Sequence, residues 1–180
     1  MKNKNISRRR FIENTVKASL AFTIVPRFVL GGNGYVAPSD KLNVGFIGTG
    51  KQGRLLMKYF WGKVQMVAGS DVDSQKLALF KTLTEKQYAE EKQQAAYNGL
   101  ATYADFREML ERKDIDAVII ASPDHWHAVH TIMAANAGKH VYCEKPLAHS
   151  VEEGRAMVDA VKRNKVVLQT GSMQRSWKNF

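Results

Sequence analysis

The 180-residue chain has very little cysteine, a single Cys143. One cysteine excludes an internal disulfide, so the stability of the fold has to come from an apolar core. Internal repeats and low-complexity tracts are also lacking. With 44% hydrophobic residues, the chain is long enough to bury the core of one domain.

Acidic residues are scarce relative to basic ones, 17 against 27, which gives a formal net charge of +10. Half of this excess lies in residues 1–40, which hold seven Lys or Arg and only two Asp or Glu. The later part of the chain has no basic run with interleaved aromatic residues. This charge distribution argues against nucleic acid as a partner.

Long hydrophobic runs are missing as well. The apolar stretch from Ala18 to Val25 is too short to span a bilayer, and it follows the basic segment Ser7-Arg8-Arg9-Arg10-Phe11-Ile12. This order is typical of an export signal, and the paired arginines before Phe resemble the twin-arginine signal. We therefore expect residues 1–40 to be an export leader and linker, with no stable membrane anchor, and the protein to be periplasmic or otherwise exported. Because no clean cleavage site precedes the domain, a basic N-terminus on a cytoplasmic protein is the alternative.

From Lys41 onward, short apolar runs alternate with longer segments of helical spacing. This alternation predicts the α/β class, a doubly wound parallel sheet of the Rossmann type in residues 41–180, with ligands outside the carboxyl ends of the strands. Residues 74–97 favour helix but contain a threonine-rich interruption near residues 82–84, which predicts two helices or one broken helix. The other predicted helices are 54–61, 105–112, 127–137 and 151–164, and the predicted strands are 42–47, 64–69, 100–102, 115–121, 140–143 and 166–170.

The end of the first predicted strand carries the glycine loop Gly48-Thr49-Gly50-Lys51-Gln52-Gly53. In a turn from strand to helix, such glycines allow a tight turn, close approach of the backbone to a pyrophosphate, and close packing of helix on strand. Asp71, after the second strand, can accept hydrogen bonds from the adenosine ribose hydroxyls and would repel a 2′-phosphate. The expected cofactor is NAD. NADP is the less favoured alternative, since Lys51 and Arg54 could bind a phosphate.

Two further loops follow predicted strands. In Ser122-Pro123-Asp124-His125-Trp126-His127, Asp124 can cap the next helix and Trp126 offers a flat apolar face. Taken alone, this loop is equally consistent with an ordinary capped helix start. In Glu144-Lys145-Pro146, the lysine could orient a substrate hydroxyl or relay its proton, or it could simply be a solvated lysine in a turn. His125, His127 and His130 are close in sequence, but a fourth zinc ligand is not evident, so no metal site is predicted.

Together these motifs resemble the N-terminal domain of the Gfo/Idh/MocA oxidoreductase family, and the resemblance covers residues 41–180. It implies NAD(P)-dependent hydride transfer to or from a sugar, an inositol or a related polyol, which would be the small-molecule partner. It implies that Lys145 is the catalytic or orienting lysine, that Glu144 lies near the nicotinamide, and that Asp124 and His127 belong to the cofactor pocket. The predicted cofactor-binding residues are therefore Gly48, Thr49, Gly50, Lys51, Gln52, Gly53, Asp71, Ser122, Pro123, Asp124, His127, Glu144, Lys145 and Gln174.

The same resemblance leaves other functions open. Some members with a similar leader are NAD-dependent glycosidases, in which bound NAD transiently oxidises a sugar hydroxyl and the net reaction is hydrolysis. The family's second α/β domain, through which its members usually form homo-oligomers, is expected to be absent from these 180 residues. A non-catalytic nucleotide-binding fragment is therefore the alternative from another class.

Overall fold

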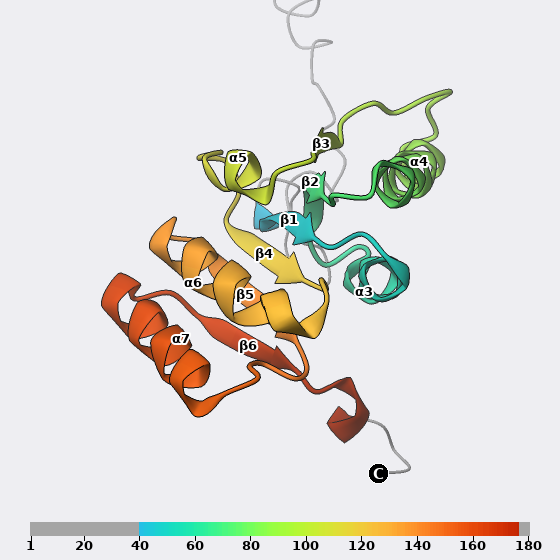
Figure 1. The fold of residues 1–180 in the computed structure, drawn as a ribbon. Helices are drawn as coiled ribbons and strands as arrows, with labels where there is room; N and C mark the ends of the chain where they lie inside the picture. The colour runs from blue at the N-terminus through green and yellow to red at the C-terminus, as the bar shows by residue number, and fades with distance from the viewer. Residues whose placement is uncertain (1–39, 177–180) are drawn as a thin grey trace, which may run out of the picture. The chain divides into compact units, whose positions relative to one another are not determined.

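The computed structural model describes residues 40–176, so the predicted leader lies outside the described residues. From Lys41 the chain forms one compact unit, built on a single six-stranded sheet (Figure 1). The strands are β1 (Asn43–Ile47), β2 (Gln65–Ser70), β3 (Ala101–Tyr103), β4 (Ala117–Ile120), β5 (His140–Glu144) and β6 (Leu168–Gly171). The α-helices are α3 (Lys51–Phe60), α4 (Ser74–Glu91), α5 (Phe106–Leu110), α6 (His127–Asn136) and α7 (Val151–Asn164), and the 3₁₀ turns are η2 (Asp124–Trp126) and η3 (Met173–Ser176). Within residues 40–176, no helix combines the length and the apolar character needed to cross a membrane.

The strand order is β3-β2-β1-β4-β5-β6, and each neighbouring pair is parallel. This is the doubly wound order, in which the direction of winding reverses between β1 and β4. The prediction of a Rossmann-type α/β sheet is thus confirmed. The reversal also puts the ends of β1 and β4 side by side, where such sheets bind their ligands.

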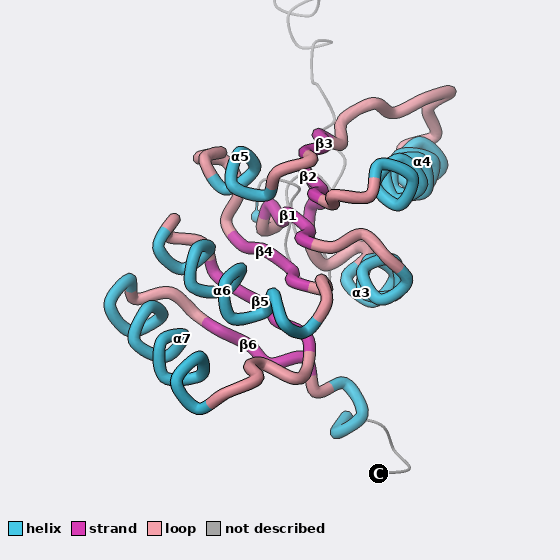
Figure 2. Tube along the Cα trace, in the orientation of Figure 1, coloured by secondary structure: helices cyan, strands magenta, loops and turns pink. Residues whose placement is uncertain are grey.

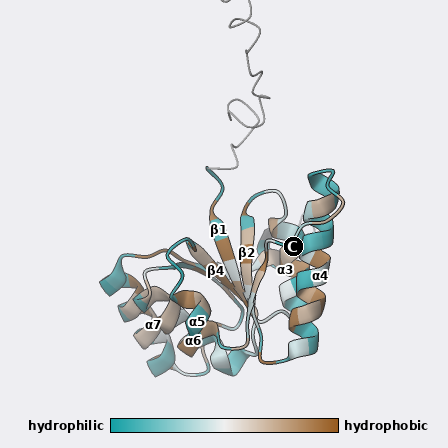
Figure 3. Cartoon of the chain, turned by 90° about the horizontal axis from the view of Figure 1, so that it is seen from above, coloured by the Kyte–Doolittle hydropathy of each residue, from teal (hydrophilic) through white to brown (hydrophobic). Residues whose placement is uncertain are grey.

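Helices cover both faces of the sheet, with α3 and α4 on one face and α5, α6 and α7 on the other (Figures 1 and 3). Two apolar cores lie beneath them, because successive side chains of a strand point to opposite faces. In β1, Phe46 packs in the core with buried residues of α3 and α4, while Ile47 packs in the core with residues of α5 and α6. In β4, Ile119 belongs to the first core and Ile120 to the second.

The threonine-rich part of residues 74–97 does not break a helix, so that expectation was wrong. α4 runs without interruption from Ser74 to Glu91. The hydroxyls of Thr82 and Thr84 donate to the carbonyl oxygens four residues earlier, of Ala78 at 3.0 Å and of Phe80 at 2.8 Å. Threonine therefore satisfies its hydroxyl within the helix.

Candidate functional site

A cavity of about 850 Å³ lies at the carboxyl ends of β1, β2 and β4. Its size is in the range of small-molecule binding sites. Residues from three of the predicted motifs line it: Gly48, Gly50 and Lys51 after β1, Asp71 after β2, and Ser122, Pro123 and Trp126 after β4. The fold thus brings together residues that are up to 78 positions apart in the sequence, counted from Gly48 to Trp126. The loops that follow β1, β2 and β4 are drawn in pink in Figure 2.

The glycine loop needs glycine at two positions. Gly48 has a φ of +89°, a conformation that side-chain-bearing residues rarely adopt. A Cβ at Gly53 would collide with the carbonyl oxygen of Gly48, so only glycine lets α3 start this close to the turn. No side chain of the described residues caps the first turn of α3, which leaves its early N–H groups to an anion. Thr49, Gln52 and Gly53 also belong to the glycine loop motif, residues 48–53, but do not line the cavity.

Asp71 is held against the glycine loop. Its Oδ2 accepts hydrogen bonds from the backbone N–H and the hydroxyl of Thr49, at 2.7 and 3.0 Å, and its Oδ1 accepts from the N–H of Asp73 at 2.9 Å. A carboxylate has about four acceptor positions, so these three hydrogen bonds leave about one, and Asp71 lines the cavity. Asp73, not Asp71, caps α4, because its Oδ1 accepts from the N–H groups of Gln75 and Lys76.

The cap expected from Asp124 is not formed. Pro123 O accepts from the Trp126 N–H at 2.9 Å and so begins the 3₁₀ turn η2 ahead of α6. The Asp124 carboxylate is half exposed and instead accepts from the His125 N–H, with His149 Nε2 3.4 Å away. The hydrogen bond from His149 lowers the pKa of Asp124. Asp124 is not among the residues that line the cavity.

His130 is a cavity residue that the sequence did not single out for cofactor binding. Its ring stacks on Trp126 with centroids 5.4 Å apart, and its Nδ1 is 2.9 Å from Ser122 Oγ. Burial, followed by the proximity of His127, lowers the pKa of His130 to about 4, so the ring is neutral at pH 7. Its spacing of three residues from His127 on a helix was the available signal. Within residues 40–176, no group of three His, Cys, Asp or Glu side chains could hold a metal ion.

His127 lies behind the cavity, not in its wall. The residue is only 2% exposed. Its Nδ1 is 2.6 Å from Pro146 O and its Nε2 is 2.9 Å from Ser122 O. Both ring nitrogens are therefore engaged with backbone carbonyls of the two loops that follow β4 and β5.

The Glu144-Lys145-Pro146 loop follows β5 at the same edge of the sheet, since Ile120 of β4 pairs with Cys143 of β5. Lys145 is exposed, and its peptide bond to Pro146 is cis. Glu144 is 4% exposed; its carboxylate accepts from the Lys145 N–H at 3.3 Å and lies 3.4 Å from the Tyr142 hydroxyl. Burial, and then the Glu144 charge, raise the pKa of Tyr142 to about 12.

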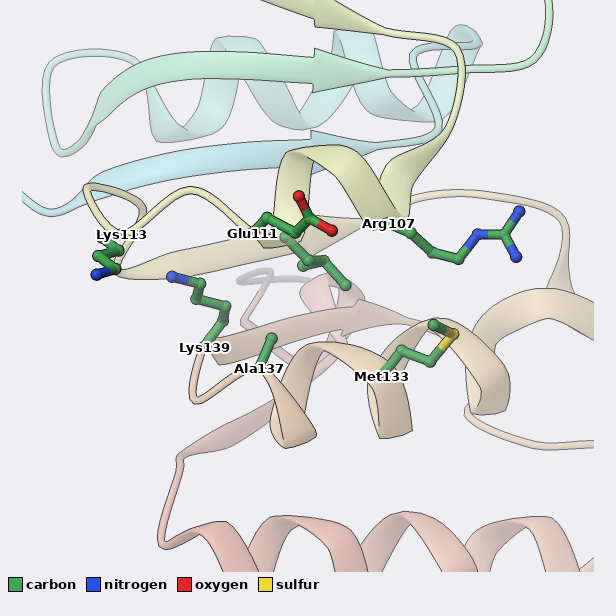
Figure 4. A pocket seen from close by; sticks show the side chains of 7 residues that line it. Arg107, Glu111, Lys113, Met133, Ala137 and Lys139 are labelled. Carbon is green, nitrogen blue, oxygen red and sulfur yellow. The ribbon is translucent and has the colours of Figure 1, made fainter.

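The structure does not bring every predicted residue to the cavity. Gln174 is exposed in η3, and neither it nor Glu144 nor Lys145 lines the cavity. A second cavity, of about 470 Å³, lies between α5 and α6 (Figure 4). Arg107, Leu110, Glu111, Lys113, Met133, Ala137 and Lys139 line it. None of these was a predicted site residue, and the Lys139 ammonium at its edge donates to Arg112 O at 2.6 Å.

Comparison with known proteins agrees with the geometry at the strand ends. Residues 42–172 match the model of the Gfo/Idh/MocA family, described as an oxidoreductase family with an NAD-binding Rossmann fold. The chain belongs to this family. Its described domain is accordingly an oxidoreductase NAD-binding domain, as the motifs had indicated.

Among its relatives, the levoglucosan dehydrogenase of Pseudarthrobacter phenanthrenivorans is 52% identical over 64 residues, which cover 36% of this chain and 16% of the relative. A glycosyl hydrolase family 109 protein of Shewanella baltica is 30% identical over 174 residues, covering 88% of this chain and 38% of the relative. The chain thus spans well under half the length of these relatives.

The solved structures of two inositol dehydrogenases share the fold. The scyllo-inositol dehydrogenase of Lactobacillus casei, solved with bound NAD(H) and scyllo-inositol, has a TM-score of 0.65 and 25% identity, covering 77% of this chain and 38% of its own. The myo-inositol 2-dehydrogenase of Lactobacillus plantarum has a TM-score of 0.61 and 29% identity over the same shares.

Proposed function

We propose that the chain is the cofactor-binding part of an NAD-dependent oxidoreductase that acts on a sugar, an inositol or a related polyol by hydride transfer. The observation that carries this proposal is the convergence of the glycine loop, Asp71 and the loop after β4 on one cavity at the strand ends. The residues fit the cofactor: free N–H groups at the start of α3 suit the pyrophosphate, and Asp71 retains an acceptor position for the ribose. The dehydrogenases of levoglucosan and inositols among its relatives support the substrate class.

NAD, when bound, supplies the acceptor for the hydride that leaves the substrate carbon. The chain's own part in the reaction is to orient the substrate hydroxyl and to take up its proton. We assign both tasks to Lys145, because its side chain is exposed just past the end of β5, beside the loop that lines the cavity. A neutral amine at Nζ would accept the hydroxyl proton as the carbonyl forms.

The test replaces Lys145 with methionine in the full-length protein. We expect turnover to fall by about a hundredfold or more, the usual loss on removing a general base, while the NAD dissociation constant stays within about threefold. Lys162→Met, on the exposed last turn of α7, is the matched control and should keep its rate. A rate retained in Lys145→Met would contradict the role of the lysine.

Titrating the unmodified protein with NAD and with NADP tests the role of Asp71. Equal affinities for the two cofactors would contradict that role.

A second candidate is an NAD-dependent glycosidase, which the match to glycosyl hydrolase family 109 proteins over 88% of the chain supports. The two reactions differ in their products. A net oxidoreductase accumulates one reduced cofactor per substrate converted, whereas the glycosidase releases free sugar with no net change in NADH absorbance. Failure to bind either NAD or NADP would contradict both candidates, and NAD binding without any turnover would favour a non-catalytic binding module.

We also propose that residues 1–40 export the folded protein through a twin-arginine pathway. The basic segment at residues 7–12 supports this, and the match to the family 109 proteins includes part of residues 1–40, because 88% of the chain exceeds the length of residues 41–180. Replacing Arg8 and Arg9 with lysine should retain the protein in the cytoplasm, since the pathway reads the arginine pair. Cell fractionation measures the outcome, and equal export of both forms would contradict the proposal.

A further inference from the structure

The backbone pairing that joins β4 to β5 ends with these strands and does not continue into the loops that follow them. Pairing between β4 and β5 extends from Ala117–His140 to Ile120–Cys143 and stops there. Beyond this point, side-chain contacts join one loop to the other. Among the described residues, these contacts include the exposed pair Asp124 and His149, at 3.4 Å, and the buried ring of His127.

His127 bonds to both loops at once. Its Nδ1 is 2.6 Å from the carbonyl oxygen of Pro146, the residue directly after Lys145. Its Nε2 is 2.9 Å from the carbonyl oxygen of Ser122. The hydroxyl of Ser122 in turn contacts His130 in the cavity wall. Since α6 begins at His127, the backbone of the helix anchors the ring. The ring therefore forms a bridge from the wall of the cofactor cavity to the loop that carries the lysine.

The chemistry of the two partners determines which form of the ring makes this bridge. Carbonyl oxygens only accept hydrogen bonds, so each contact needs an N–H on the ring. A neutral imidazole has one N–H and can make only one of the two bonds. Only a ring with hydrogen on both nitrogens can donate to both carbonyl oxygens at once.

We propose that His127 is a positioning residue, which holds Lys145 in place relative to the cofactor cavity through hydrogen bonds to Ser122 O and Pro146 O. This inference deepens the proposed function, on which the role of Lys145 rests. Its consequence is specific: loss of the bridge should impair the step that uses Lys145 more than it impairs cofactor binding. A residue that contacted the cofactor would affect cofactor binding at least as strongly.

The first test compares His127→Phe, which fills the site without donors, with the control His125→Asn, a change at an exposed histidine of the same loop. In the full-length protein, His127→Phe should lower kcat at least tenfold and change the NAD dissociation constant less than threefold. Amide hydrogen exchange, followed by mass spectrometry, should speed up at least tenfold in residues 144–150 and 121–126, with no change in β1 and β2. His125→Asn should leave all three measurements within twofold.

The second test separates hydrogen bonding from the filling of space. His127→Gly should recover at least fivefold in exchange protection and in rate on addition of imidazole, which can carry two N–H groups. 1-Methylimidazole has at most one N–H and should not restore either property. Equal recovery with both compounds would overturn the two-bond bridge, as would wild-type exchange rates in His127→Phe. If the unmodified protein binds no nicotinamide cofactor, the proposed function fails, whereas the exchange measurements still decide the bridge.

Discussion

The same added methyl group should have opposite effects at two glycines of this chain. At Gly53, a Cβ would meet the carbonyl oxygen of Gly48, which is backbone and cannot rotate away. At Gly154, in the first half of α7, a Cβ would meet no atom within 4 Å. The first glycine is therefore required by packing, while the second only adds flexibility to a helix.

We predict that Gly53→Ala weakens NAD binding at least tenfold and lowers the free energy of unfolding by about 1–3 kcal/mol, because the turn has to move. Gly154→Ala should raise the free energy of unfolding by about 0.5–1 kcal/mol and leave NAD affinity unchanged. Urea unfolding and titration with NAD measure both quantities. Wild-type affinity in Gly53→Ala would contradict the assignment of this loop to the cofactor.

Single residues differ in how well the sequence predicts their place. The glycine loop and Asp71 could be located because each comes directly after a predicted strand. Gly48, Gly50 and Asp71 do line the cavity. The position of His127 could not be foreseen, since it depends on a contact with Pro146, 19 residues away. Nor could the sequence show that Thr49, and not solvent, holds the Asp71 carboxylate.

Among the elements, those with a strong local signal matched best. α7 has the predicted bounds, 151–164; Ser150 Oγ accepts from the Glu153 N–H at its start, and its first turn is acidic and its last basic. α4 was harder to predict, because threonine has a low helix propensity. In the folded domain Thr84 is fully buried beneath the helix, and this burial offsets the low propensity. β3 has only three residues and, among the described strands, pairs only with β2, so little periodicity marks it in the sequence.

At the scale of the whole molecule, the candidate site residues of the described domain lie at the carboxyl ends of the strands, and the two apolar cores lie on the two faces of the sheet. The order of the strands determines this arrangement. Ile47, the last residue of β1, pairs with Ile120, the last residue of β4, although 73 positions separate them in the sequence. Their pairing brings Gly48 and Ser122 to one cavity. The sheet order thus explains why motifs far apart in the sequence meet, which local patterns alone do not reveal.

The stability of the whole domain should depend on pH through His130, which is 7% exposed. Burial lowers its pKa in the folded protein from the ordinary 6.5 to about 4. As the pH falls below about 6.5, the unfolded chain therefore takes up a proton that the folded protein still excludes, and stability declines until the pH reaches about 4. At about 1.4 kcal/mol per pH unit, the loss is on the order of 3 kcal/mol, and above pH 6.5 this histidine contributes no pH dependence.

Urea unfolding between pH 7.5 and pH 4 measures this decline, and His130→Phe identifies its source. Phenylalanine keeps a ring against Trp126 and Phe106 but cannot be protonated, so the variant should lose markedly less stability across this range than the unmodified protein. His125→Asn, on the exposed turn η2, should retain the full decline. Asp124, whose pKa is lowered by His149, adds a further loss only as the pH approaches the range in which its carboxyl is protonated, because its stabilising contact needs the charged form. An identical pH dependence in His130→Phe and the unmodified protein would show that the buried histidine is not the group that makes this fold sensitive to acid.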